Sequence, residues 1–173
     1  MKTLIAFYSR RGSNYVDGDI VDLPLGNTEV AAQTIQKRTG GELFRIETVK
    51  PYPADYHETT EVSRQELRQK ARPALVAPVA DVAAFDVVVL GYPNWWGTMP
   101  MAVCTFLEAQ RWSGKTILPL CTHEGSGLGR SEADLRKLCP GAKVLGGLAI
   151  RGSGVRSAEA EIAEWLDASR LFG

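Results

Sequence analysis

The sequence has 173 residues, and this length predicts a single domain spanning residues 1–173, because domains cluster at about 100–200 residues. Lys and Arg together number 20, as do Asp and Glu, so the formal net charge is zero. That balance argues against the basic surface of a nucleic-acid-binding protein and against the strong anionic field of an acidic carrier.

Cysteine usage and the apolar runs bear on the cellular compartment. Cys104, Cys121 and Cys139 are odd in number, and no two have the spacing of a zinc knuckle or a redox pair. We therefore expect buried thiols in a reducing compartment. No segment approaches the ~18 apolar residues of a membrane span, and the first residues show no signal-peptide cleavage pattern. These features predict a cytoplasmic protein that contacts neither membrane nor nucleic acid.

Apolar runs predict the strands, and the periodic segments between them predict helices. Two runs, at 4–8 and 87–90, are nearly continuous, which is typical of strands buried on both faces of a parallel sheet. Strands are expected at residues 4–8, 42–46, 87–90, 117–121 and 144–150. Helices are expected at residues 27–38, 57–71, 101–109, 131–138 and 157–172, of which 57–71 is almost entirely polar and is expected to face solvent.

The alternation of strands and helices predicts an α/β fold, namely a three-layer, doubly wound parallel sheet of five strands with right-handed crossovers. In such a sheet, ligands bind beyond the carboxyl ends of the strands, where the winding reverses. Functional residues are therefore expected just after Ser9, Gly91 and Cys121. Pro119 lacks the N–H that a strand ladder needs, so we expect a bulge there.

The first of these loops leads from Ser9 to a helix that begins near Asn27 and Thr28. These three residues offer hydroxyl and amide donors at a helix N-terminus, where exposed N–H groups and the helix dipole favour a phosphate. Either arginine after Ser9 could supply positive charge. Asn27 or Thr28 could equally serve as the N-cap of the helix. Residues 16–20 predict a tight hairpin with a type I′ turn, which folds over the site or decorates its rim.

The second loop, residues 91–100, carries two adjacent tryptophans between glycines and prolines. Trp95 and Trp96 point to opposite sides in an extended stretch, so at least one indole is expected to leave the core. A flat, polarisable side chain at the ligand end of a sheet is suited to stacking on a planar ring. The alternative is that one or both tryptophans close the end of the core.

The third loop, residues 121–129, is rich in glycine. Glycines let a ligand approach closely and expose backbone N–H groups that could bind carbonyl oxygens or a developing anion. His123 and Glu124 stand where they could contact a bound molecule. His123 could equally be a solvated loop residue, and Glu124 is expected to be solvated rather than catalytic. Together the three loops predict a phosphate cradle, an aromatic platform and a loop that binds a ring.

With these motifs in place, the sequence resembles the flavodoxin family over nearly its whole length. It looks most like the bacterial short-chain branch with the pattern Gly-Tyr-Pro-x-Trp-Trp-Gly-Thr-x-Pro. The resemblance implies a sheet of order 2-1-3-4-5 that holds FMN without a covalent bond, with the redox chemistry residing in the flavin. It rests on residues 7–9, 26–28, 52–56, 91–100 and 121–127, of which the last two segments are specific.

By position, the resemblance also assigns FMN contacts. Residues 10–25 intervene where many flavodoxins have only a few residues, and Arg11, Asn14 and Tyr15 are expected to reach the phosphate or the ribityl chain. The residues expected to bind the phosphate itself are Ser9, Asn27 and Thr28. The residues expected to line one side of the isoalloxazine are Pro93, Asn94, Trp95, Trp96 and Gly97. Those expected to approach its other edge are Thr122, His123, Glu124, Gly125, Ser126 and Gly127.

Three functions are compatible with this reading. The first is an FMN-binding electron carrier between cellular donors and acceptors, with a redox protein as partner. The second is an NAD(P)H-dependent FMN quinone reductase that acts on a small quinone-like acceptor. A more remote possibility is a non-redox binding module that has lost FMN. Zero net charge weakens the carrier hypothesis, because carriers use a strong field to steer docking. The chain is expected to be a monomer or a homodimer.

Phosphate-handling enzymes on the same fold are disfavoured. A cysteine phosphatase needs a thiolate nucleophile in the first loop, and residues 9–15 contain no cysteine. A phosphoacceptor domain needs carboxylates after the first and third strands, and none is present there.

In the flavin hypothesis, burying an anionic hydroquinone in an aromatic site is costly. Glu124 raises that cost by repulsion, which predicts a low potential for full reduction.

Overall fold

The strands of the central sheet are parallel and follow the spatial order β4-β1-β5-β6-β7, with β8 also paired to β6. In sequence terms this is the order 2-1-3-4-5, so the expected fold class is confirmed. The computed structural model describes residues 1–76 and 81–172. Its sheet strands are β1 (Thr3–Phe7), β4 (Glu42–Arg45), β5 (Val87–Pro93), β6 (Thr116–His123), β7 (Lys143–Val144) and β8 (Leu148–Arg151).

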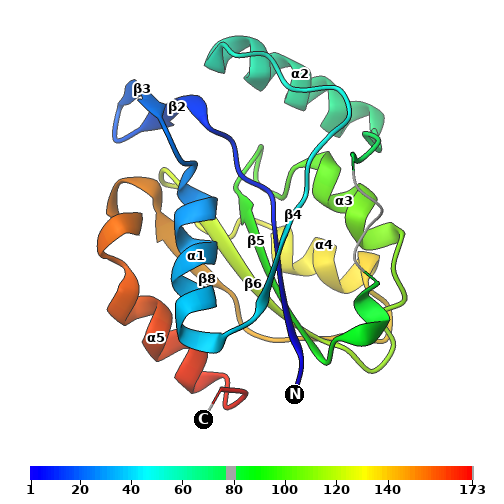
Figure 1. Ribbon diagram of the computed structural model, residues 1–173. Coiled ribbons are helices and arrows are strands. Elements are labelled where there is room, and N and C mark those ends of the chain that lie inside the picture. The colour runs from blue at the N-terminus through cyan, green and yellow to red at the C-terminus, as the bar shows by residue number, and fades with distance from the viewer. Residues whose placement is uncertain (77–80, 173) are drawn as a thin grey trace.

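Helices cover both faces of the sheet and give the expected three layers (Figure 1). One face carries α1 and α5, and the opposite face carries α3 and α4. The chain termini lie at the end of the sheet away from the carboxyl ends of the strands. The helices are α1 (Asn27–Thr39), α2 (Tyr56–Gln69), α3 (Met101–Glu108), α4 (Ser131–Leu138) and α5 (Glu159–Ala168), with short 3₁₀ helices η1 (Val82–Ala84) and η2 (Gly152–Ser157).

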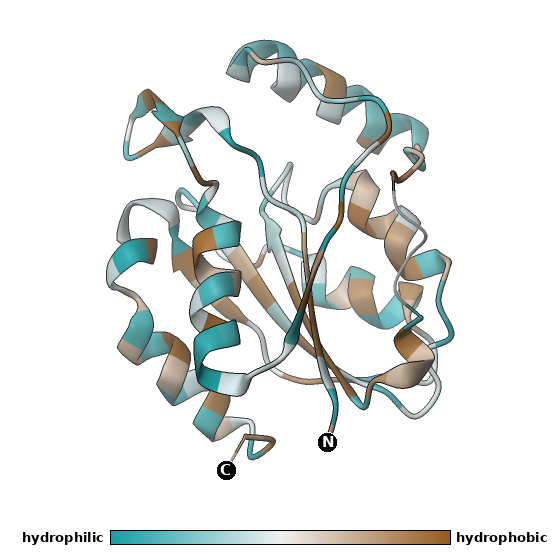
Figure 2. Ribbon diagram, viewed as in Figure 1, coloured by the Kyte–Doolittle hydropathy of each residue, from teal (hydrophilic) through white to brown (hydrophobic). Residues whose placement is uncertain are grey.

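The side chains of β1 explain why its sequence reads as a continuous apolar run. Leu4 and Ala6 pack into the cluster under α3 and α4, while Ile5 and Phe7 pack into the cluster under α1 and α5. All four are at most 4% exposed. Because both faces of the strand are covered, no polar position is left in the alternation. Figure 2 shows the same pattern, with brown strands at the centre and teal on the outer faces of the helices.

The fifth strand position differs from the prediction, because residues 144–150 form no single strand. They are divided between β7 and β8, and both pair with β6. Pro119 lies opposite this gap, and its register with β5 is continuous, so the expected bulge is absent. Ile117 accepts a hydrogen bond from Leu145 on the β7 side. Backbone groups point to alternate sides along a strand, so the nitrogen of Pro119 also faces the β7 side. The neighbouring strand is interrupted at this point, so no N–H donor is required from residue 119. A Cβ on Gly147 would lie 3.1 Å from Pro119.

Two segments outside the central sheet lie beyond the carboxyl ends of its strands (Figure 1). One is a hairpin of β2 (Gly12–Val16) and β3 (Asp19–Leu23). Its turn residues Asp17 and Gly18 have φ angles of 51° and 95°, as the expected type I′ turn requires. The other is α2, which was expected to face solvent. Its residues Thr59 and Ser63 are buried, so one side of this polar helix covers the end of the sheet.

The last helix is shorter than expected, because residues 152–157 form the 3₁₀ helix η2 and α5 ends at Ala168. Leu171 and Phe172 then pack back against the α1 and α5 cluster. The three cysteines are buried free thiols, as expected. Across residues 1–76 and 81–172, no helix has both the length and the apolar character of a membrane span.

Candidate functional site

A cavity of about 270 Å³ opens at the carboxyl ends of β1, β5 and β6, between the α1 N-terminus and the polar helix α2. It brings together most of the residues that the sequence singled out. Those that line it are Ser9, Asn14, Tyr15, Asn27, Thr28, Pro93, Asn94, Trp95, Trp96, Thr122, His123 and Glu124. Arg11, Gly97, Gly125, Ser126 and Gly127 do not line it, and Arg10, Tyr56, Thr59, Thr60 and Ser63 are additional lining residues.

The α1 N-terminus forms a backbone cradle beside Ser9. The N-cap is Gly26, without a side-chain hydrogen bond, and not Asn27 or Thr28 as the capping alternative expected. A Cβ on Gly26 would lie 2.1 Å from Ser9 Oγ and 2.6 Å from the carbonyl oxygen of Arg10, so only glycine fits. Within the described residues, the backbone N–H groups of Asn27 and Thr28 have no acceptor. Two free amides at a helix N-terminus suit an anion such as phosphate.

Ser9 and Thr28 connect this cradle to the sheet. Ser9 Oγ accepts a 3.0 Å hydrogen bond from the backbone N–H of Glu29, which leaves its own hydroxyl hydrogen free to donate. The hydroxyls of Thr28 and Thr122 lie 2.7 Å apart and share a hydrogen bond. Both threonines are at most 4% exposed. This contact fixes the first and third loops relative to each other.

The two arginines after Ser9 have different roles. Arg11 turns away from the cavity and pairs with Glu29 at 2.9 Å, and Arg45 pairs with the other oxygen of that carboxylate at 2.9 Å. The hydrogen bond from Arg11 lowers the pKa of Glu29, which burial alone would raise. Arg10 is the arginine that lines the cavity. Its guanidinium donates to the carbonyl of Ser13 and, at 2.8 Å each, to the carbonyls of Pro53 and Ala54.

The tryptophan loop supplies both an aromatic wall and a contact to α2. Trp95 is half-buried, lines the cavity and packs against the hydrophobic core. It is therefore placed both to stack on a ligand ring and to close the end of the core. Trp96 is 44% exposed, with φ at 58°, and its indole N–H donates to Ser63 Oγ at 3.0 Å. Asn94 holds the loop in place, because its side chain donates to the Gly127 carbonyl and accepts from the Gly97 N–H. Gly97 and Gly127 thus contribute backbone hydrogen bonds that hold Asn94 and do not line the cavity.

In the third loop, His123 Nδ1 accepts a 2.9 Å hydrogen bond from the backbone N–H of Gly125. The neutral imidazole therefore carries its proton on Nε2. Burial is the main reason that the pKa of His123 lies below its usual value, and the positive charge of Arg151 lowers it further. Neutral His123 can thus offer an N–H donor at the cavity. Gly125 and Ser126 are exposed on the outer side of the loop.

Glu124 is not the freely solvated residue that the sequence suggested. Its Oε2 accepts a 3.0 Å hydrogen bond from the backbone N–H of Asp17, which joins the third loop to the hairpin turn. Its Oε1 is buried and has no hydrogen-bond partner in the part of the chain that the structure describes. A Cβ on Gly152 would lie 2.2 Å from Oε1 and 2.3 Å from Asn27 Nδ2, so a larger residue there would displace these two side chains.

Helix α2 closes the cavity from above with the hydroxyl groups of Thr59, Thr60 and Ser63. Tyr56, at its N-terminus, stacks on Tyr15 of the hairpin with ring centroids 6.1 Å apart. The sequence contained one unused signal for this arrangement. A helix without an apolar stripe cannot pack on a hydrophobic sheet face, so it must lie elsewhere.

The fold and the cavity at the carboxyl ends of the strands define a flavodoxin-like α/β protein. The family model for flavodoxin matches residues 24–169, and the chain belongs to the flavodoxin family. A comparison with curated proteins finds no significant match.

Solved structures agree with this assignment. A protein from Bacteroides eggerthii named as a flavoprotein is 30% identical, with 98% of each chain covered and a TM-score of 0.78. A second, from Bacteroides uniformis, is 26% identical, with 96% of this chain and 97% of that chain covered and a TM-score of 0.75. A flavoprotein from Lactobacillus acidophilus in complex with FMN shares the fold at 19% identity and a TM-score of 0.66, over 95% of this chain and 98% of that chain.

Proposed function

We propose that the cavity binds FMN and that the protein carries electrons through this flavin between cellular donors and acceptors. Membership of the flavodoxin family and the FMN complex of a structural neighbour suggest a flavin. The observation that carries the proposal is the juxtaposition of two unpaired amides at the α1 N-terminus with an indole wall in one cavity. Bound FMN would supply reversible one- and two-electron redox chemistry.

The donor set fits a flavin mononucleotide. Ser9, Asn27 and Thr28 would hold the phosphate through hydroxyl, amide and backbone N–H groups, and the charge of Arg10 lies at the same cavity. The indoles of Trp95 and Trp96 would hold one side of the isoalloxazine. At about 270 Å³ the cavity lies just below the roughly 300–1,000 Å³ typical of ligand sites. That size favours a mononucleotide over the larger FAD.

The third loop would contribute at the other edge of the ring. Thr122, His123 and Glu124 line the cavity there, and His123 would donate from Nε2. Gly125, Ser126 and Gly127 would act through the shape of the loop. The hairpin and α2 would exclude water from the ring, which strengthens each polar contact inside.

Reconstitution with flavins tests the proposal. Titration of the purified protein with FMN is expected to quench flavin fluorescence at a stoichiometry of one. Riboflavin, which lacks the phosphate, should bind at least about tenfold more weakly, a difference of ~1.4 kcal/mol. FAD should bind more weakly than FMN. Equal affinities for FMN and riboflavin would show that the α1 N-terminus does not bind the phosphate. If no flavin is quenched, the proposal is wrong.

The position of α2 favours a second candidate, an NAD(P)H-dependent FMN quinone reductase. Its hydroxyl-bearing side covers the cavity, and Trp96 and Tyr15 tie it to two loops. A covered cavity suits a small acceptor better than the cofactor of a docked protein. Steady-state oxidation of NADH or NADPH by the FMN-loaded protein with a soluble quinone separates the two functions. Turnover well above that of free FMN supports the reductase, and its absence supports the carrier.

A further inference from the structure

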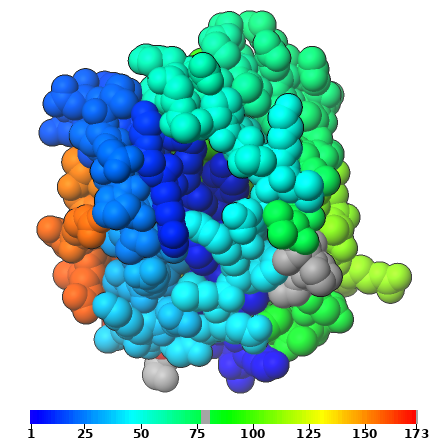
Figure 3. Space-filling view, turned by 45° about the horizontal axis from the view of Figure 1, so that its top comes forward, coloured from blue at the N-terminus to red at the C-terminus, as the bar shows by residue number. Residues whose placement is uncertain are grey.

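A second hollow, of about 670 Å³, lies on the other side of the segment that follows β1. Figure 3 shows it beneath α2, between the blue residues after β1 and the cyan residues after β4. Tyr8 and Tyr52 are among its lining residues, and Ser9 and Arg10 border both cavities. The proposed cofactor site and this hollow are therefore separated by a thin wall.

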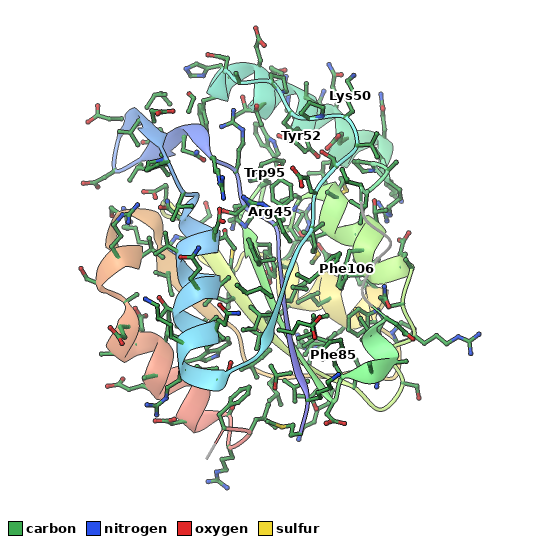
Figure 4. All side chains as sticks on the ribbon, in the orientation of Figure 1. Arg45, Lys50, Tyr52, Phe85, Trp95 and Phe106 are labelled. Carbon is green, nitrogen blue, oxygen red and sulfur yellow. The ribbon has the colours of Figure 1, made fainter. Side chains whose placement is uncertain are left out.

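Three aromatic side chains make up that wall. Trp95 lines the first cavity, and Tyr8 and Tyr52 line the second. The Trp95 ring meets the Tyr52 ring at 5.1 Å between centroids and 88°, and the Tyr8 ring at 5.2 Å and 77°. These edge-to-face contacts bring the π-systems into direct van der Waals contact. Figure 4 shows Tyr52 and Trp95 close together near the carboxyl ends of the strands.

Tyr52 has a proton acceptor in place and Tyr8 does not. The Tyr52 hydroxyl donates a 2.7 Å hydrogen bond to Glu66 Oε2 of α2. Burial is the main cause that raises the pKa of Glu66, so its carboxylate is a stronger base than an exposed one. The Tyr8 hydroxyl has no carboxylate partner among the described residues, whereas burial raises the pKa of both phenols and does not distinguish them. Oxidation of a phenol at neutral pH requires loss of its proton, so Tyr52 is the better electron donor of the two.

We propose that Trp95, Tyr52 and Glu66 form a proton-coupled relay that moves an oxidising equivalent from the flavin cavity to the second hollow. A one-electron oxidant in the first cavity, such as photoexcited flavin or a small inorganic radical, takes one electron from Trp95. One electron then passes from Tyr52 to the Trp95 radical cation. The Tyr52 O–H bond breaks, and the proton moves to Glu66 Oε2. The products are neutral Trp95, a neutral Tyr52 radical and a protonated Glu66 carboxyl group.

The relay draws damaging oxidation away from the cofactor wall. Both side chains are half-buried, but Trp95 lines the first cavity and Tyr52 lines the second hollow. Both the electron donor and the proton acceptor are held before oxidation occurs, by the ring contact and by the hydrogen bond. Neither step requires a rearrangement of α2.

Transient absorption after a laser flash tests the relay in the FMN-loaded protein, an arm that rests on the proposed function. The tryptophan radical signal is expected to convert into the band of a neutral tyrosyl radical. Tyr52→Phe keeps the ring contact but has no hydroxyl, so the tyrosyl band should vanish and the tryptophan radical should persist at least about tenfold longer. Tyr8→Phe, which removes the other phenol in contact with Trp95 but keeps its ring, should change neither signal.

Glu66→Gln separates the proton acceptor from the fold. The amide oxygen still accepts the hydrogen bond but is a much weaker base, so tyrosyl formation should slow by about tenfold or more. A tyrosyl band that survives in Tyr52→Phe, or an unchanged rate in Glu66→Gln, would overturn the relay.

A second arm needs no flavin. Azide radicals generated by pulse radiolysis oxidise tryptophan, and the flavin-free protein should show the same tryptophan-to-tyrosine transfer, lost in Tyr52→Phe and slowed in Glu66→Gln. If FMN does not bind, the proposed function fails while this arm still decides the relay. If FMN binds but neither arm shows transfer through Tyr52, the relay is wrong and the proposed function stands.

Discussion

The Ser9 hydroxyl accepts a 3.0 Å hydrogen bond from the backbone N–H of Glu29, so a side chain at the end of β1 caps the first turn of α1. Ser9→Ala is therefore expected to lower the free energy of unfolding by about 1 kcal/mol, the usual loss of a capping hydrogen bond. FMN affinity should fall by about tenfold, because the hydroxyl donor to the phosphate is lost as well. Fluorescence titration and urea unfolding measure the two effects.

The matched control for this change is Ser13→Ala, at a serine of the same segment that contributes only its backbone carbonyl to the Arg10 contact. It should leave both quantities nearly unchanged. Riboflavin affinity should also be similar in Ser9→Ala and the unmodified protein. A similar loss for riboflavin would show that Ser9 acts on the ring or the fold and not on the phosphate.

Gly26 provides a sharper test of the cradle. A Cβ there would lie 2.1 Å from Ser9 Oγ and 2.6 Å from the Arg10 carbonyl oxygen, and the latter is backbone that cannot rotate away. Gly26→Ala is expected to destabilise the fold by about 1–3 kcal/mol through overpacking and to abolish FMN binding at micromolar concentration. Gly154→Ala is the control, because a Cβ there meets nothing within 4 Å. Wild-type affinity in Gly26→Ala would contradict the proposed position of the phosphate.

These contacts show how far the sequence could lead. The continuous run at residues 4–7 predicted a strand covered on both faces, and the Asp17-Gly18 pair predicted the hairpin turn, because both signals are local. Pro119 was misread for a reason that is not local. The sequence shows the missing donor, but not that the neighbouring strand breaks before Leu148, where no donor is required.

Only one indirect signal in the sequence, the lack of an apolar stripe, bears on the position of α2. Its hydroxyl-bearing residues Thr59 and Ser63 look like a solvent face, because periodicity reports which side is polar but not what that side covers. Its position depends on long-range contacts from Arg10 to the carbonyls of residues 53–54 and from Trp96 to Ser63. No pattern within the helix encodes them.

Arg10 is expected to be the main clamp on α2. Its guanidinium reaches the Ser13, Pro53 and Ala54 carbonyls at once, which a lysine ammonium on a flexible stem cannot match. Arg10→Lys should speed amide hydrogen exchange in residues 56–69 by about fivefold, corresponding to ~1 kcal/mol. Arg38→Lys, at an exposed pair with Asp167, should not. Unchanged exchange in Arg10→Lys would show that other contacts hold the helix.

The Glu29 carboxylate predicts a pH dependence of stability. Its pKa is lowered chiefly by the hydrogen bond from Arg11, with help from the charge of Arg45. A carboxyl whose folded-state pKa is depressed contributes stability above its unfolded pKa of about 4.3, and this contribution disappears as the pH falls through the folded value. Glu29→Gln should therefore lower the unfolding free energy by about 1–3 kcal/mol at neutral pH.

The difference between Glu29→Gln and the unmodified protein should shrink steadily as the pH is lowered below the ordinary range of a glutamate. Chemical unfolding at a series of pH values measures it. Glu42→Gln, at an exposed position of β4, provides the control and should show little difference at any pH. A Glu29→Gln difference that is constant with pH would mean that the packing of this side chain matters and its charge does not.

Glu124 is expected to set the reduction potential of the bound flavin. Its carboxylate lines the cavity, and one of its oxygens is buried without a hydrogen-bond partner in the described part of the chain. Negative charge that is poorly solvated opposes the addition of electrons to a nearby ring. Glu124→Gln keeps an oxygen for the Asp17 N–H and removes the charge. The midpoint potential for full reduction should rise by about 30 mV, or ~1.4 kcal/mol for two electrons. Anaerobic redox titration measures this shift, and Glu159→Gln, an exposed charge on α5, should leave the potential unchanged. If Glu124→Gln does not raise the potential, the carboxylate serves to hold the hairpin turn and does not tune the flavin.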